Sequence, residues 1–197
     1  MPALSISIDD VALATVSMDG YDVMSVHIGG TRVDEILATL DLSGGSYPDA
    51  AESTYLTWIN QIPLLPGQVI TVTFLDAAFT SHAGKTFEEL FPDEPSSTQT
   101  EPKPRSDMFA EVRAMPKLRD RFSFRLVSSS GTNFTGETTQ DEHGFGFHVL
   151  WNSRSPDRAR AAFHSYTLDQ LKARAPMNYH FEDDLHYGDW VRFELTA

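Results

Sequence analysis

The densest group of reactive side chains in the sequence is the segment His180-Phe-Glu-Asp-Asp-Leu-His186. It brings His180, Asp183, Asp184 and His186 close together, and imidazole combined with carboxylate is a donor set that binds zinc, manganese or iron. The spacing matches no established metal motif, so a polar turn before the last predicted strand is the competing interpretation. A metal site at these four residues, in a small metal-dependent enzyme, is therefore one hypothesis.

Other patterns typical of catalysis are incomplete. Gly84-Lys85-Thr86 is similar to the end of a phosphate-binding loop, but Phe79 stands where that loop requires a glycine. No Gly-x-Ser-x-Gly segment is present to expose a nucleophilic serine. The chain has no cysteine, which excludes disulfides, a thiol nucleophile and cysteine-ligated metals. The sequence therefore favours a non-enzymatic protein without a cofactor.

Three tryptophans, Trp58, Trp151 and Trp190, are candidates for a surface that stacks on a sugar or a peptide. Trp151 shares the apolar face of a predicted strand with Phe145 and Phe147, so we expect it in the core. Trp190 lies opposite the apolar face of the last predicted strand, where an exposed ring would be an interface candidate. It is the binding residue of a second hypothesis, a ligand-binding β-module.

Charge is distributed unevenly along the chain, whose formal net charge is −13. Residues 1–100 carry fourteen acidic side chains against two basic ones, a charge of −12, whereas residues 101–197 carry fourteen against thirteen, a charge of −1. The scarcity of cations excludes direct nucleic-acid binding through the first half, because phosphate contacts need Lys and Arg. A negative surface attracts basic partners and speeds their encounter, although solubility is a simpler explanation of the charge.

The candidate binding residues of the acidic half are six carboxylates. They are Asp22, Asp34, Glu35, Asp41, Asp49 and Glu52. In the second half, Arg154, Arg158 and Arg160 form a locally basic segment. We expect these arginines to pair with the acidic half and dock the two halves together, or to stay solvated; contact with an acidic partner is a further alternative.

No part of the sequence indicates membrane insertion or export. No stretch approaches the roughly 20 apolar residues that a membrane-spanning helix requires. Residues 1–10 lack basic residues and a long apolar run and include Asp9 and Asp10, which argues against a secretory signal peptide. We therefore predict a cytoplasmic protein without a membrane partner, and the oligomeric state does not follow from the sequence.

Alternation of apolar and polar residues predicts strands through most of the chain. Ile70, Val72 and Phe74 share one face of a half-buried strand, for example. Capping-box spacing that begins at Thr86 and at Thr167 predicts one short helix in each half.

A proline-rich stretch divides the sequence into two parts. Residues 92–106 contain four prolines and no large apolar residue, which is typical of an exposed linker. The sequence therefore predicts an acidic β-rich domain over residues 1–91 and a β-rich domain with one short helix over residues 107–197.

The two parts show signs of a tandem duplication. Gly67–Phe74 aligns with Gly188–Leu195, and an aromatic residue, Trp58 or Tyr179, precedes each glycine by nine positions. A turn followed by an alternating strand is a common pattern, so chance similarity is the alternative. We predict a mainly β protein of two small antiparallel β-sandwich or barrel-like units, each with a short helix.

The predicted role is that of a non-enzymatic acidic module that masks a basic partner protein, as a bacterial toxin-neutralising (immunity-like) protein or an inhibitor would. Its basis is a half of charge −12 beside a half of charge −1, with no catalytic motif in either. The metal-dependent enzyme and the ligand-binding β-module are the alternatives.

Overall fold

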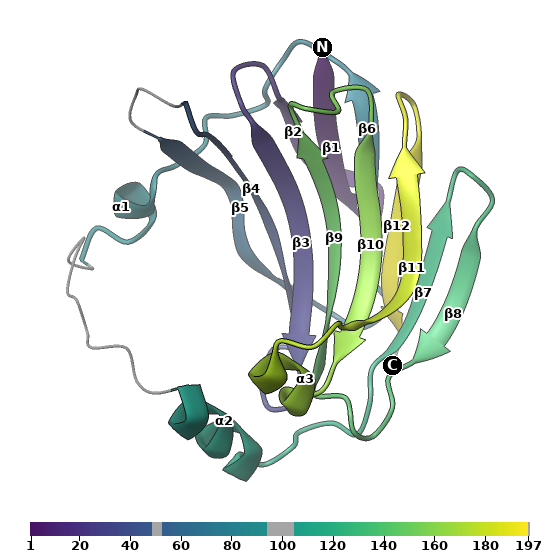
Figure 1. Ribbon diagram of the computed structural model, residues 1–197. Helices are drawn as coiled ribbons and strands as arrows, with labels where there is room; N and C mark the ends of the chain where they lie inside the picture. The colour runs from purple at the N-terminus through teal and green to yellow at the C-terminus, as the bar shows by residue number, and fades with distance from the viewer. Residues whose placement is uncertain (49–52, 94–104, 197) are drawn as a thin grey trace.

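The structure is a computed structural model that describes residues 1–48, 53–93 and 105–196 (Figure 1). These residues form twelve strands in two six-stranded antiparallel sheets, which confirms the predicted mainly β fold. Sheet I has the order β2 (Val11–Ser17), β1 (Pro2–Ile8), β6 (Val69–Asp76), β12 (Trp190–Thr196), β7 (Ser123–Ser128) and β8 (Asn133–Glu137). Sheet II has the order β5 (Thr54–Leu64), β4 (Ala38–Ser46), β3 (Val23–Thr31), β9 (Gly144–Asn152), β10 (Ala159–Tyr166) and β11 (Asn178–Leu185).

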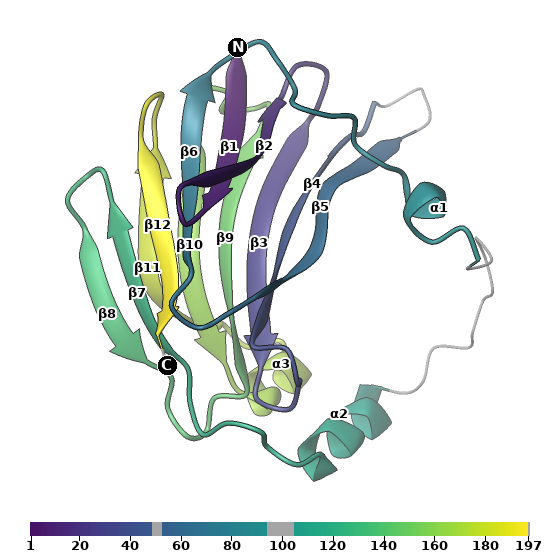
Figure 2. The same ribbon diagram turned by 180° about the vertical axis from the view of Figure 1, so that it is seen from behind.

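The two sheets lie face to face, with sheet II nearer the viewer in Figure 1 and sheet I nearer in Figure 2. Each half of the chain contributes three adjacent strands to each sheet. The strand order is symmetric, because each strand of the first half has a counterpart six strands later in the mirrored position. This is the arrangement expected of a tandem duplication.

Hydrogen-bonded ladders join the two halves inside both sheets. In sheet I, β6 pairs with β12, so that Ile70 lies opposite Phe193 and Val72 opposite Val191. In sheet II, β3 pairs with β9 over its whole length. The two sandwich-like units are therefore fused edge to edge, a contact that the sequence left open.

The strands of the sequence alignment, β6 and β12, are thus neighbours at the centre of sheet I. Both follow a turn glycine with positive φ, Gly67 at 82° and Gly188 at 92°, a conformation that favours glycine. The aligned residues therefore have equivalent turns as well as equivalent strands.

The core runs without interruption through both halves and between both sheets. At its centre the rings of Phe193 on sheet I and Phe147 on sheet II stack with centroids 5.1 Å apart. Phe163 lies 5.7 Å from Phe193 and 4.2 Å from Phe124. Trp151 is buried, as its strand pattern predicted.

Three helices stand outside the described sheets: α1 (Phe87–Leu90), α2 (Arg105–Ala114) and α3 (Leu168–Ala173). Both predicted capping boxes are confirmed, at Thr86 for α1 and at Thr167 for α3. The second half contains α2 besides the one short helix expected of it, and α2 begins inside the expected linker, of which residues 94–104 lie outside the described part of the chain. No helix of the described residues is long and apolar enough to cross a membrane.

A truncation at the centre of the core tests the fusion of the halves. We expect Phe193→Ala to lower the free energy of unfolding by about 3–5 kcal/mol, because the fully buried ring would leave a cavity between the sheets. The same loss should be seen for strands of both halves in amide hydrogen exchange, since one core serves both. Loss of protection in β7–β12 alone, with β1–β6 unchanged, would contradict a single cooperative sandwich.

Candidate functional site

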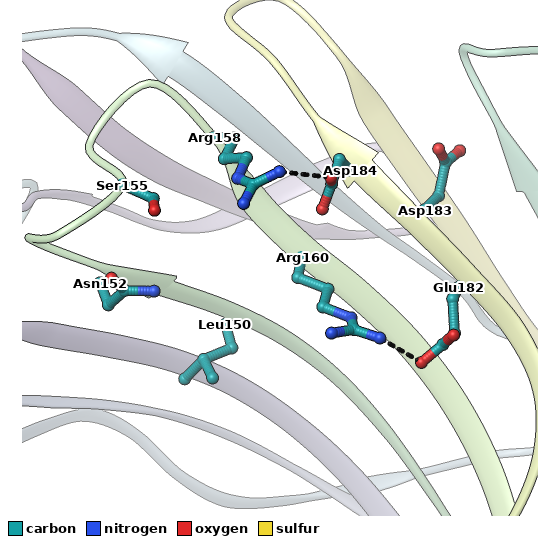
Figure 3. A pocket seen from close by; sticks show the side chains of 8 residues that line it. All are labelled: Leu150, Asn152, Ser155, Arg158, Arg160, Glu182, Asp183 and Asp184. Atoms are coloured by element: carbon teal, nitrogen blue, oxygen red, sulfur yellow. Dashed lines mark hydrogen bonds and ion pairs between the residues drawn. The ribbon is translucent and has the colours of Figure 1, made fainter.

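A hollow of about 740 Å³ lies on the outer face of sheet II, over β9, β10 and β11 and the β9–β10 connection (Figure 3). We call it the β9–β11 hollow. Its lining is mostly polar and includes both charges: Leu150, Asn152, Ser155, Arg158, Arg160, Glu182, Asp183 and Asp184.

The register of three neighbouring strands builds this hollow. Arg160 on β10 lies between Leu150 on β9 and Asp184 on β11, its two cross-strand partners. Because successive residues of a strand face opposite sides, Arg160 points outward while Ala159 and Ala161 are buried in the core. Strand alternation therefore places Arg160 on the outer face of sheet II, where the hollow lies.

Two ion pairs cross the hollow (Figure 3). Arg158 Nη1 lies 2.9 Å from Asp184 Oδ2, and Arg160 Nη2 lies 2.5 Å from Glu182 Oε1. For Arg158 and Arg160 the expected pairing with the acidic first half is wrong, because the antiparallel pairing of β10 with β11 places acids of the second half beside them. All four side chains are substantially exposed, so the pairs add little stability and stay accessible to a ligand.

Three histidines form a patch next to the hollow, on the same face of sheet II. His27 on β3 is the direct cross-strand partner of His148 on β9, and the ring of His148 lies 5.8 Å from that of His164 on β10. A Cβ at Gly146 would lie 2.8 Å from His164 Nε2 and 3.6 Å from His27 Nε2. Because Gly146 has no side chain, the rings of His27 and His164 have room beside it.

The histidine patch is uncharged at neutral pH. Burial lowers the pKa of His27, His148 and His164, although Asp41 opposes this effect at His27. Burial and the neighbouring imidazoles bring the pKa of His164 to about 4. Its Nδ1 atom is buried without a hydrogen-bond partner in the described structure. Within the described residues, no three His, Asp or Glu side chains are placed to hold a metal ion.

The residues of the metal hypothesis point in different directions. Their segment was expected to be a turn, but most of it is the strand β11, in which neighbours face opposite sides. Asp183 accepts hydrogen bonds from the hydroxyls of Ser128 and Ser130, whereas Asp184 pairs with Arg158 across the hollow. His180 packs on the rings of Phe124, Phe134 and Phe163, and His186 is exposed after the strand.

His180 belongs to a buried polar network that the sequence did not indicate. Ser165 donates a short hydrogen bond to Glu142 Oε1 and accepts one from His180 Nε2 at 2.6 Å. Glu142 also accepts from Asn178 Nδ2 and from the Thr139 amide, both at 2.7 Å. Ser165 is 0% exposed, and the carboxylate contacts the serine rather than the imidazole, so this is not the arrangement of a nucleophilic triad.

Four of the six acidic candidates lie in the described chain, and they are spread along the first-half side of sheet II. Asp22 precedes β3 and accepts from the Tyr47 amide at 2.6 Å, whereas Asp34 and Glu35 follow β3 at its other end, about 30 Å away for a strand of this length. Asp41 lies between them on β4, opposite His27. Two further candidates, Asp49 and Glu52, lie outside the described residues.

Trp190 stands on β12 in sheet I, away from the β9–β11 hollow. Its ring is partly exposed and lies under the guanidinium of Arg192, 4.8 Å from the ring centroid. The ring therefore already has a cationic neighbour within the chain.

Comparison of the chain with protein-family models, with curated proteins and with solved structures finds no match. The site is therefore interpreted from its own geometry.

The depressed pKa of His164 predicts a specific pH dependence of stability. Between pH 6.5 and about 4 an unfolded histidine binds a proton while the folded His164 does not, so stability falls as the pH falls through this window. We expect His164→Gln to remove on the order of 1 kcal/mol of that loss, allowing for solvent screening. Denaturant unfolding above and within the window, with His186→Gln as control, measures the effect. Equal pH dependence of wild type and His164→Gln would contradict it.

The network around Glu142 predicts an acid-sensitive loss of stability. Burial raises the pKa of Glu142, but hydrogen bonds from Ser165, Asn178 and the Thr139 amide outweigh burial and lower it below 4.5. Its stabilisation is therefore present above pH 4.5 and is lost as the pH falls through the lower folded value.

We expect Glu142→Gln to cost on the order of 2 kcal/mol at neutral pH, because an amide N–H₂ would face buried donors. The difference from wild type should shrink in acid, where the carboxyl is protonated. Urea unfolding of both proteins at neutral pH and below pH 4.5 checks this, with the exposed Glu137→Gln as control. A difference that does not change with pH would argue against an ionised Glu142.

Proposed function

We propose that this protein is a non-enzymatic binding protein whose first half covers a basic surface on a partner protein. The observation that carries the proposal is the strand order. In both sheets the three first-half strands lie together on one side of the sandwich and the three second-half strands on the other (Figures 1 and 2). The strands of the acidic half therefore lie on one side of the sandwich, and eleven of its fourteen acidic residues belong to the described part of the chain.

The second half balances its own charges. Four ion pairs of the described residues join arginines and carboxylates within that half: Arg113–Asp169, Arg121–Glu137, Arg158–Asp184 and Arg160–Glu182. Among the ion pairs of the described chain, Arg192–Asp10 at 3.9 Å is the one between side chains of different halves. Of the first-half carboxylates that the structure describes, Asp10 is therefore the one that forms an ion pair with a second-half side chain.

One of the two cations of the first half, Arg32, is buried where the two halves meet. Arg32 is 3% exposed, and its guanidinium donates to the main-chain carbonyls of Arg119 at 2.9 Å, of Gln140 and of Glu142 at 3.3 Å. In return Arg119 donates to the Thr31 carbonyl at 2.6 Å. Arg32 and Arg119 therefore join the halves through main-chain carbonyls, and Arg119, which also donates to the Glu35 carbonyl at 3.2 Å, places a second-half cation beside the β3–β4 connection.

The exposed carboxylates of the first half, which include Asp34, Glu35, Glu88 and Glu89, are dispersed over several elements, and we call this surface the acidic side. Asp34 and Glu35 lie on the β3–β4 connection, and Glu88 and Glu89 lie on α1, which packs on β5. Such a side suits a partner with several dispersed cations, because long-range attraction raises the association rate without requiring individual contacts. Neutralising a basic toxin or inhibiting a basic enzyme in the cytoplasm is the role that we propose for it.

Charge-matched variants test the proposal. We expect Asp34→Asn with Glu35→Gln to weaken binding of poly-L-lysine by roughly 3- to 10-fold at low salt, since each exposed charge contributes up to about 1 kcal/mol. The control, Asp141→Asn with Asp157→Asn, removes the same charge from exposed positions of the second half and should change binding less than about 2-fold. Fluorescence anisotropy at low and high salt measures both.

Two results would refute the acidic side as a binding surface. One is absence of poly-L-lysine binding by the wild type at low salt. The other is equal weakening by the two double variants, which would indicate a response to net charge alone.

A further inference from the structure

The β9–β11 hollow lies in the second half, so partner binding through the acidic side leaves it free. Its charged groups form two ion pairs. The Arg158 guanidinium uses one nitrogen for Asp184, and the Arg160 guanidinium uses one for Glu182. Since a guanidinium has five N–H donors and a carboxylate about four acceptor positions, each group keeps further capacity. The hollow therefore offers hydrogen-bond donors and acceptors side by side.

The charge balance of the hollow selects the class of ligand. Arg158 and Arg160 balance Glu182 and Asp184, while Asp183 turns away to Ser128. An anion would meet two carboxylates in a chain of net charge −13, and a cation would meet two guanidiniums. A neutral hydroxyl group donates one hydrogen bond and accepts two, so neighbouring hydroxyls satisfy a guanidinium and its carboxylate together.

An apolar surface lies directly beside these polar groups. Leu150 is 39% exposed and is the cross-strand partner of Arg160, so its side chain lies next to the Arg160–Glu182 pair. A sugar ring has the same combination, hydroxyls at its edge and a C–H face, and it would place that face on Leu150. Asn152 and Ser155 add neutral hydrogen-bonding groups on the opposite wall (Figure 3).

The size of the site and its neighbours suit a ligand of more than one ring. A volume of about 740 Å³ falls within the range of small-molecule sites. Along the same face, the ring of Tyr179, 54% exposed, lies 5.5 Å from that of His164. A chain of sugars that leaves the hollow in this direction would meet uncharged rings on which it can stack.

We propose that the β9–β11 hollow binds a neutral carbohydrate. Its hydroxyls bridge the Arg158–Asp184 and Arg160–Glu182 pairs, and the C–H face of one ring rests on Leu150.

A neutral-glycan array and three soluble hexasaccharides, of maltose, cellulose and chitin type, test this with the full chain. We expect at least one neutral glycan to bind, with a Kd on the order of 0.1 mM by titration calorimetry. Citrate and trilysine serve as charged probes and should not compete. Absence of binding by every neutral glycan, or displacement by either charged probe, would overturn the proposal.

A matched pair of variants locates the site. Arg160→Gln with Glu182→Gln should weaken glycan binding at least roughly 10-fold, since both hydrogen-bonding groups of one pair lose their charge. Arg121→Gln with Glu137→Gln removes an equally exposed pair on sheet I, also 2.5 Å apart, and should leave affinity unchanged. Neither change alters net charge, and thermal unfolding confirms that both variants fold. Equal affinity of wild type and Arg160→Gln with Glu182→Gln would place the ligand elsewhere and refute the assignment.

Discussion

The main-chain pairing of β6 with β12 and of β3 with β9 is the interaction on which the rest of the structure depends. Without it each half would consist of two three-stranded sheets with unpaired edges, a small unit with little core. With it the sheets have six strands each and enclose one continuous core. The side chains at this junction reinforce the ladders, because Arg32 and Arg119 donate to carbonyl groups on opposite sides of it.

The same junction also determines how charged residues are distributed over the two sheets. Had the strands of the two halves alternated within each sheet, the carboxylates of residues 1–100 would be mixed with the arginines of residues 101–197. Because the halves lie side by side instead, Arg121, Arg158 and Arg160 pair with acids of their own half. The edge strand β11 supplies two of these acids, because Asp184 pairs with Arg158 and Glu182 pairs with Arg160.

Local features of the fold were predictable from the sequence, and long-range pairings were not. Alternation identified the face of β6, and the capping boxes placed α1 and α3, because both depend on residues close in the chain. The proximity of His27 to His148 depends on the register of β3 against β9, which joins residues 121 positions apart. The partners of Arg158 and Arg160 were assigned to the wrong half for the same reason. A more careful period-2 assignment could have identified β11, since Phe181 and Leu185 alternate with acids.

The carboxylates Glu182 and Asp184 of the β9–β11 hollow are paired with arginines, whereas most described carboxylates of the acidic side are not. This difference separates the two proposed roles. In the hollow each guanidinium lies within 3 Å of a carboxylate, so the field falls off quickly and recognition depends on contact geometry. On the acidic side most of the described carboxylates lack a cationic partner, so their field extends to about a Debye length and favours partners with little geometric constraint. The two surfaces lie in different halves, and neither uses the residues of the other. The proposed binding of a small neutral ligand and the proposed binding of a basic macromolecule would therefore not compete for the same residues, and any coupling between them would have to pass through the shared sheets.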